Sequence, residues 1–349
     1  LDQYEEELEK IRKKKRNYTP WQVAIGAGFA CGGFCIQFGC DWVAFLYASI
    51  AAILGMRLRQ VCNESGLNHY MGIAISAFVA TIIAWASTLL PAEWTSTPWH
   101  PLLACALFIV PGVPLINFVD DMLDNYIQVG IVRAVNTLLM VAAMAFGIAF
   151  AVKLCHIENF FPTISMVPHH QYWEYAIAAA ISAMGFSMIF NIQRRLLWVV
   201  AIGGIIAVCT RNFVNLGPST DNIGLDMGLV IGSFSGAVLV SLIAIKAVHW
   251  FHVPNHVLTI PSVIPMIPGV LMYRMLFGII NINVQSIDQV TPLMKAIESG
   301  VNSGLVIMCI ALGVAIPNIF GRRFIASSKN KRLAELLKER KARGKFVEW

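Results

Sequence analysis

The sequence has 349 residues, of which 57% are hydrophobic and only 13% are charged. A soluble domain carries about 25% charged residues, so a soluble core could not cover this much apolar surface. The net charge of +6 does not indicate a nucleic-acid partner, because the basic residues lie in the two tails and in short loops rather than along one stripe. The composition therefore predicts an all-α, polytopic membrane protein.

Ten stretches without Asp, Glu, Lys or Arg predict transmembrane helices. A helix needs about 20 mostly apolar residues to cross the hydrocarbon layer. The ten stretches are Trp21 to Phe38, Trp42 to Met56, Tyr70 to Ala92, Pro101 to Val119, Ala134 to Val152, Tyr175 to Gln193, Leu196 to Thr210, Met227 to Ile245, Val253 to Tyr273 and Ser299 to Gly321.

The distribution of Lys and Arg predicts the orientation of these spans. Basic residues precede the first span, from Lys10 to Arg16, and follow the last, from Arg322 onward, whereas the loop from Pro91 to Pro101 has none. Because Lys and Arg favour the cytoplasmic side, we expect both tails in the cytoplasm and this loop outside. An even number of spans, such as ten, satisfies that arrangement.

An internal repeat relates the two halves of the sequence. The matches in chain order are Gly33-Phe34 with Gly185-Phe186, Phe38 with Phe190, Arg59 with Arg211, Pro111-Gly112-Val113 with Pro268-Gly269-Val270, and Val135-Asn136 with Val301-Asn302. A repeat of five spans reverses its direction in the bilayer the second time, so we expect two inverted five-helix repeats. Inverted repeats are typical of secondary transporters, whose substrate site lies where the halves meet.

The repeat divides the chain into five parts. They are a cytoplasmic amphipathic helix or linker at 1–20, a first membrane repeat at 21–155, an extracytoplasmic linker at 156–174, a second membrane repeat at 175–323 and a cytoplasmic basic tail at 324–349.

Proline and glycine interrupt the fourth and ninth predicted spans, at Pro111-Gly112 and Pro268-Gly269. Proline inside a membrane helix frees a carbonyl group that lipid cannot hydrogen-bond. Such a break must face protein, water or ligand, and a matching break in both halves predicts the substrate site. A packing kink without a ligand is the alternative.

Polar residues follow the first break. On a continuing helix, Asn117, Asp121 and Asp124 share one face by their i, i+4, i+7 spacing. That face would line a cytoplasmic vestibule with carboxylates, and Arg133 could pair with one of them. A solvated acidic turn remains the alternative.

Three further polar residues lie in or beside apolar runs. Asn136 and Asn302 must find hydrogen-bond partners there, and an amide can bind both the carboxylate and the ammonium group of an amino acid. Hydrogen bonding between helices is the alternative. Glu298 lies one turn before Asn302, and an ionisable group within the membrane is a functional candidate.

No pattern in the sequence predicts a metal site, a cofactor or an enzyme. The eight cysteines lie mostly inside spans and form no paired CxxC motif, which favours free, apolar cysteines. The histidines lie in loops or span ends without metal-ligand spacing, and no Ser-His-Asp order, Walker loop or GxGxxG is present.

The run Val110-Pro111-Gly112-Val113-Pro114-Leu115-Ile116-Asn117, followed by Asp121, resembles the first membrane domain of the bacterial threonine/serine exporter family. Residues from Tyr175 to Arg323, with Ile267-Pro268-Gly269-Val270 and Tyr273-Arg274, resemble its second membrane domain. In that family a cytosolic domain precedes the first membrane domain. This sequence begins at Leu1, in the connecting segment, so an N-terminal portion could be missing.

The resemblance implies a proton-coupled exporter of threonine and serine in the bacterial cytoplasmic membrane, with succinate as the alternative substrate because two-chain relatives are associated with succinate export. The partners would be the small-molecule substrate, protons and the lipid bilayer, with no nucleic acid, and homo-oligomer formation stays open. A channel or a membrane scaffold without turnover is the alternative from another class.

Overall fold

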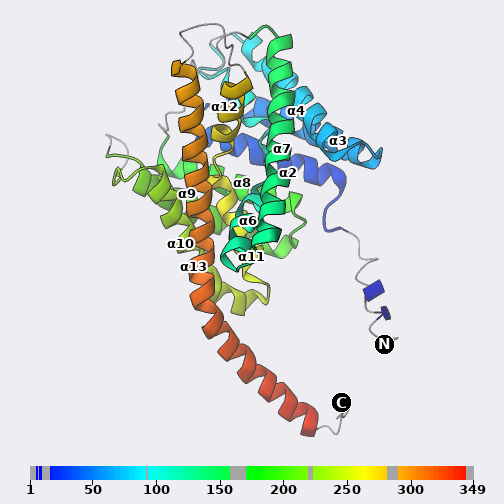
Figure 1. Ribbon diagram of the computed structural model, residues 1–349, viewed down its shortest axis with the longest axis vertical. Helices are drawn as coiled ribbons and strands as arrows, with labels where there is room; N and C mark the ends of the chain where they lie inside the picture. The colour runs from blue at the N-terminus through cyan, green and yellow to red at the C-terminus, as the bar shows by residue number, and fades with distance from the viewer. Residues whose placement is uncertain are drawn as a thin grey trace.

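The computed structural model of the protein describes residues 5–6, 8–9, 16–91, 93–157, 170–218, 223–280 and 290–342, and these residues contain helices and no strand (Figure 1). The first half contains α2 (Pro20–Gln37), α3 (Trp42–Glu64), α4 (His69–Trp85) with η1 (Ala86–Leu89), α5 (His100–Ala104), η2 (Leu107–Ile109), α6 (Gly112–Leu123) and α7 (Ile127–Leu154). The second half contains α8 (Tyr172–Ile189), η3 (Arg194–Leu196), α9 (Leu197–Asn215), α10 (Leu229–Phe251), α11 (Asn255–Val263), η4 (Ile264–Met266), α12 (Gly269–Ile280) and α13 (Val290–Ala342).

Side chains in the connecting loops fix the starts of the first three helices. The Thr19 hydroxyl accepts a hydrogen bond from Gln22 N, the Gln22 side chain accepts one from Thr19 N, and Pro20 occupies the first turn. Asp41 and Asn68 cap α3 and α4 by accepting bonds from Ala44 N and Tyr70 N. Each cap satisfies an N–H group that the helix itself leaves unpaired.

Among the residues that the structure describes, six helices are long and apolar enough to cross a membrane, and there are up to eight such spans if each bent pair counts as one. The two other predicted spans correspond to α2 and α8, which have 18 residues each. At 1.5 Å per residue such a helix is about 27 Å long, slightly less than the hydrocarbon thickness. The fold is thus that of a polytopic all-α membrane protein, while the count of ten stays a prediction.

Both predicted breaks are present. η2 and α6 meet at Pro111, where the chain bends by 57°, and η4 and α12 meet at Pro268, where it bends by 61°. Pro111 lacks the N–H group that would continue the preceding helix, and the new helix begins at Gly112. The breaks lie at the matched Pro-Gly pairs of the two halves.

Several helices extend beyond the predicted spans, among them α7, which begins at Ile127, and α10, which continues past Lys246 to Phe251. α3 continues past Arg59 to Glu64, and α9 continues past Arg211 to Asn215, so neither arginine follows its span as expected. α13 has 53 residues and joins the tenth predicted span to most of the basic tail. The prediction ended each span at a charged residue, but Arg and Lys are good helix formers and do not end a helix.

Small residues allow α2 and α8 to pack closely. A β-carbon placed on Gly185 would lie 2.2 Å from the carbonyl oxygen of Gly26, and one on Gly33 would lie 2.3 Å from Oγ of Ser182. Ser182 also donates a hydrogen bond to Ala30 O. The first helix of each half therefore contacts the first helix of the other, through small side chains typical of membrane helix pairs.

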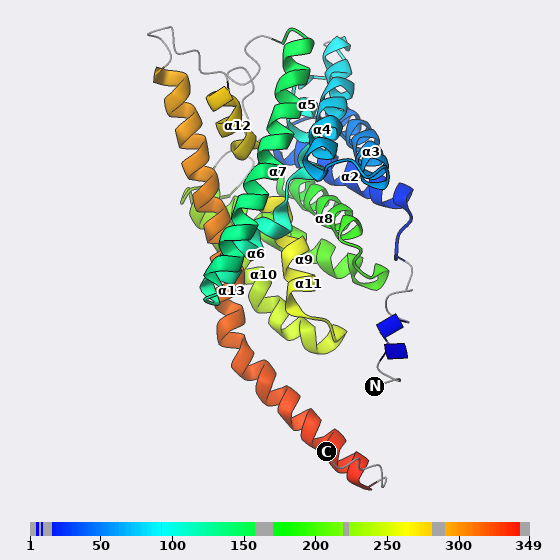
Figure 2. The same ribbon diagram turned by 45° about the vertical axis from the view of Figure 1, so that its right-hand side comes forward.

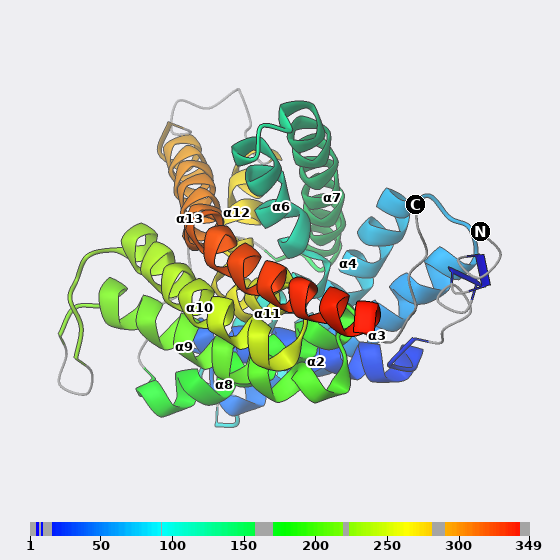
Figure 3. The same cartoon turned by 90° about the horizontal axis from the view of Figure 1, so that it is seen from below.

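Further contacts between the halves come from a group of four helices, α6, α7, α12 and α13. α6 packs against α7 and α13, and α12 packs against α13 and α7. Figure 3 shows these four helices on one side of the molecule, with α8, α9 and α10 on the other. In Figure 2, α13 extends well beyond the other helices.

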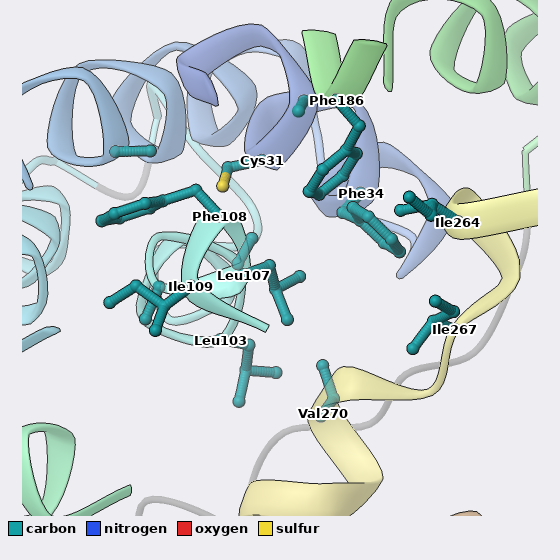
Figure 4. Close-up of a cluster of buried hydrophobic side chains, with 14 of the residues drawn as sticks. Cys31, Phe34, Leu103, Leu107, Phe108, Ile109, Phe186, Ile264, Ile267 and Val270 are labelled. Atoms are coloured by element: carbon teal, nitrogen blue, oxygen red, sulfur yellow. The ribbon is translucent and has the colours of Figure 1, made fainter. Parts of the chain in front are cut away.

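Buried apolar side chains from both halves form one continuous core. Figure 4 shows its centre, where Phe34 of α2 and Phe186 of α8 lie near Leu107 of η2 and near Ile264 and Ile267 at the second break. The Phe34 and Phe186 rings meet edge to face with their centroids 5.8 Å apart. Both breaks thus lie in the core and not on the outer surface.

Candidate functional site

A small cavity lies between the two breaks (Figure 4). Its lining residues are Phe34, Leu107, Val110, Gly112, Phe186, Ile264, Ile267 and Gly269. The cavity has about the volume of a single water molecule and no charged side chain lines it. It is therefore too small for a threonine or a succinate in this conformation, and a molecule of that size could fit only after the breaks move apart.

The two glycines of the breaks are close to the opposite half. A β-carbon on Gly112 would lie 2.8 Å from Cδ1 of Ile267, and a β-carbon on Gly269 would lie 2.7 Å from Cδ2 of Leu107. Each glycine therefore fits against an apolar side chain of the other break, and a larger side chain at either position would fill the cavity.

The polar residues that follow the first break lie along α6 and at its end. Asn117 and Asp121 are partly buried on α6, and Asp124 is its C-terminal cap. Nη1 of Arg133, in α7, lies 2.6 Å from Oδ2 of Asp121. The Arg133 side chain is 45% exposed and that of Asp121 is 22% exposed, so water weakens this ion pair.

The other predicted polar residues are exposed and do not line the cavity. Asn136 is exposed on α7 and its Oδ1 accepts a 2.7 Å hydrogen bond from the Tyr70 hydroxyl of α4. Asn302 and Glu298 are exposed on α13. The structure therefore brings Pro111, Gly112, Pro268 and Gly269 together, but it does not bring these three residues to them.

The residues that directly follow Asn136 and Asn302 on these helices are buried. Thr137 is 2% exposed and Ser303 is 3% exposed, and neither hydroxyl has a hydrogen-bond partner within the described ranges. Gly130 of α7 packs against Phe118 and Met122 of the antiparallel α6. Seven residues further along, or about 10 Å, Thr137 comes level with the start of α6.

Helix periodicity indicates that Thr137 and Ser303 face inward. Gly130, Thr137, Met144 and Ala151 recur every seven residues on α7 and all are buried. Ala296, Ser303 and Ile310 follow the same spacing on α13 and are also buried. Polarity alone favours Asn136 and Asn302 as site residues. The position on the helix, however, determines which side chain faces inward.

Sequence reasoning also missed a polar cluster that joins α2 to α9. Arg211 donates from Nε and Nη2 to Oδ1 of Asn212, at 3.1 and 3.0 Å, and from Nη2 to Oε1 of Gln37 at 3.4 Å. Gln37 is 5% exposed and Asn212 is 3% exposed. The contact joins two halves of the chain, so no spacing within one helix indicates it.

Comparison with family models identifies both halves of the chain. Residues 1–155 match the model described as "Putative threonine/serine exporter", and residues 175–320 match the model described as "Threonine/Serine exporter, ThrE". The chain belongs to the threonine/serine exporter family. The exporter family and the apolar helices together make it a multi-pass membrane protein.

Two curated relatives carry another substrate in their names. The chain is 30% identical over 141 residues to a "Probable succinate transporter subunit YjjP" of Klebsiella aerogenes, which is 40% of this chain and 54% of the relative. It is 31% identical over 137 residues to the protein of the same name in Escherichia coli K12. That alignment covers 39% of this chain and 53% of the relative. The chain spans about half the length of these relatives. No solved structure matches it.

Proposed function

We propose that the protein is a proton-coupled secondary exporter of threonine and serine, working by alternating access in a bacterial cytoplasmic membrane with both termini inside. The observation that carries this proposal is the cavity between two Pro-Gly breaks, one from each half of the chain. Matching discontinuous helices in two halves are typical of secondary transporter sites. Membership of the exporter family supplies the substrate class.

The lining of the cavity supports two inverted repeats of five spans. Its residues fall into four pairs, Phe34 with Phe186, Leu107 with Ile264, Val110 with Ile267 and Gly112 with Gly269. The first pair is 152 positions apart and the other three are 157 apart, as in the matches found in the sequence. Residues related by a two-fold axis meet each other on that axis, so a cavity lined by matched pairs is expected at the interface of two inverted halves.

Alternating access would open this closed cavity to one side at a time. Near the predicted cytoplasmic ends of α2 and α8 the two halves are joined by Asn17, which hydrogen-bonds through N and Nδ2 to Asn191, both at 2.8 Å. Arg194 donates to Asn17 O at 3.0 and 3.2 Å. These exposed bonds can break and reform at little cost, so they are suited to a contact that opens during transport.

Counterflow tests the proposal. Liposomes containing the purified protein and a high internal concentration of unlabelled threonine should take up labelled threonine transiently above equilibrium, and unlabelled serine should compete. Protein-free liposomes and a Gly112→Leu variant, whose side chain fills the cavity, should show no such overshoot. Uptake that never exceeds equilibrium would indicate a channel, and no uptake of any substrate would indicate a scaffold.

Succinate is the second candidate substrate, because the two relatives are named as succinate transporter subunits. The same liposomes loaded with succinate separate the two candidates. Exchange of succinate without exchange of threonine or serine would replace the amino-acid assignment by a dicarboxylate exporter and would leave the site unchanged.

Proton coupling requires a group whose charge changes during the cycle, and we assign this role to Asp121 and Glu298, with Asp124 and Arg133 beside Asp121. Asp121→Asn and Glu298→Gln should retain substrate exchange but lose accumulation driven by a proton gradient. Because the Asp121–Arg133 pair is partly exposed, its loss should change stability by only about 0–1 kcal/mol. Full proton-driven accumulation in both variants would contradict the assignment.

The asparagines carry the substrate-binding part of the proposal, together with Asn117. Asn136→Ala and Asn302→Ala should weaken exchange if these amides turn toward the substrate in another conformation. Thr137→Val is the informative comparison, because Thr137 is already buried next to Asn136. Loss of exchange in Thr137→Val alone would move the binding role from the asparagines to the buried hydroxyls.

A further inference from the structure

Three polar side chains meet where α2 and α9 end. Gln37 is the last residue of α2, and Arg211 and Asn212 lie in the last turns of α9. One guanidinium nitrogen, Nη2 of Arg211, donates to both amide oxygens, to Asn212 at 3.0 Å and to Gln37 at 3.4 Å. The three groups thus share a single meeting point inside the protein.

The guanidinium fixes the orientation of both amides. Arginine has only hydrogen-bond donors, so the oxygen of each amide must face it and the NH₂ group must face away. Both NH₂ groups, Nε2 of Gln37 and Nδ2 of Asn212, are buried and have no hydrogen-bond partner among the residues that the structure describes. Buried donors without an acceptor are rare in folded proteins and destabilise them, so these two groups require an acceptor that the described part of the chain does not supply.

The charge of the cluster is uncompensated as well. Within the part of the chain that the structure describes, no Asp or Glu lies at ion-pair distance from Arg211. Its three hydrogen bonds come from Nε and Nη2, which leaves the N–H groups of Nη1 for a further acceptor. One cation and two buried amide donors form a site for a small anion with two oxygens.

We infer that Arg211, Gln37 and Asn212 bind the carboxylate of the transported compound. The inference rests on the proposed function and names a binding site for it. Phe34, which lines the cavity, lies one turn before Gln37 on the same face of α2. A compound whose carboxylate contacts the cluster can therefore place the rest of its structure toward the cavity, where the lining is apolar.

Equilibrium binding to the purified full chain in lipid nanodiscs tests the inference without requiring transport. The probes are threonine, serine and succinate, and threonine amide, which lacks the carboxylate. Arg211→Gln should weaken binding of the carboxylate compounds by about 10- to 100-fold, the range expected for a lost charge-assisted hydrogen bond. Threonine amide should bind wild type and variant alike. Arg195→Gln, at the other end of the same helical segment, is the matched control and should bind all probes as wild type does.

Two further variants guard against misfolding of Arg211→Gln. Gln37→Glu and Asn212→Asp keep the oxygen that accepts from Arg211, replace the unpartnered NH₂ group and place a negative charge beside the arginine, so each should keep or raise the thermal unfolding midpoint of the ligand-free protein. The same variants should lose most of the upward shift that threonine or succinate produces in wild type. A structural role of the amides would give the opposite result, a lower midpoint with the ligand shift intact.

The outcomes separate this inference from the proposed function. If wild type binds a carboxylate compound in an Arg211-dependent way but shows no counterflow, the site stands and the exporter assignment fails. If counterflow occurs and Arg211→Gln, Gln37→Glu and Asn212→Asp all bind like wild type, the exporter stands and the site is wrong. Binding of none of the three carboxylate compounds by wild type also overturns the site. Tighter binding of succinate than of threonine and serine would identify the transported compound as a dicarboxylate.

Discussion

At the residue scale, Asp41 shows how polar side chains stabilise the loops between helices. Its carboxylate accepts hydrogen bonds from Ala44 N, from the Thr95 hydroxyl and from Ser96 N, each at 2.8 Å. Burial alone would raise the pKa of Asp41, but these bonds favour the charged form, and the pKa lies below its ordinary value of 3.8. One carboxylate thus caps α3 and fixes the loop before α5.

We predict a pH-dependent stability difference for Asp41→Ala. Because the pKa of Asp41 is lower in the folded than in the unfolded protein, the carboxylate stabilises the fold above about pH 4, and this contribution is lost as the pH falls through the folded-state value. The variant should be about 1 kcal/mol less stable at pH 7, and the difference should shrink below about pH 4. Thermal unfolding in detergent measures it. A difference that does not change with pH would contradict the prediction.

Residue identity predicted the breaks better than it predicted the polar site. The sequence predicts the breaks at Pro111 and Pro268 because each proline removes a backbone hydrogen bond from the helix and is followed by a glycine. Proline alone is not sufficient, since Pro261 and Pro317 lie inside α11 and α13. Asn136 was chosen because it is polar, but it lies on an exposed face and Thr137 is buried. Arg211 contacts Gln37, 174 positions away, and a single sequence does not give such a contact.

At the element scale, α2 and α8 approach each other closely. Both are short, and their contact relies on the absence of side chains at Gly26 and Gly185. The order of the helices could be predicted from the apolar stretches, and each expected stretch coincides with a helix or a bent pair. The lengths of the helices could not be predicted in this way, because helices such as α3, α9 and α13 continue through charged residues.

Gly185→Ala should destabilise the protein. The new β-carbon would lie 2.2 Å from Gly26 O and 2.9 Å from Ala30 N, and since both are backbone atoms, the two helices must separate. Overpacking of this kind costs about 1–3 kcal/mol, which thermal unfolding in detergent would detect.

Gly304→Ala is the matched control for this change. Gly304 also lies inside a helix, but its β-carbon would meet nothing within 4 Å. That variant should be unchanged or up to about 1 kcal/mol more stable, because alanine favours a helix over glycine. Equal effects of the two substitutions would show that the α2–α8 contact tolerates a side chain.

At the scale of the whole molecule, the all-helical architecture and the family follow from composition and from two Pro-Gly motifs. The orientation rests on Lys and Arg alone and stays a prediction. Ser96 is exposed in the loop between η1 and α5, and Ser328 lies in the extended part of α13. By the predicted orientation these two positions lie on opposite sides of the membrane.

Cysteine labelling tests the orientation. In intact cells an impermeant maleimide should modify Ser96→Cys and should not modify Ser328→Cys until the cells are permeabilised. The unaltered chain is the control, because five of its eight cysteines are buried and three are partly buried. Labelling of Ser328→Cys alone in intact cells would reverse the orientation.

The length of α13 has a mechanical consequence. Its last 21 residues, from 322 to 342, continue the helix that contributes to the four-helix group, and at 1.5 Å per residue they form a rod about 30 Å long. A rod joined rigidly to a tilting helix acts as a lever, so a tilt of about 10° inside the membrane would move its tip by about 5 Å. Any rearrangement too small to observe at the cavity would therefore be amplified at the tip, where a pair of spectroscopic labels could follow it during turnover.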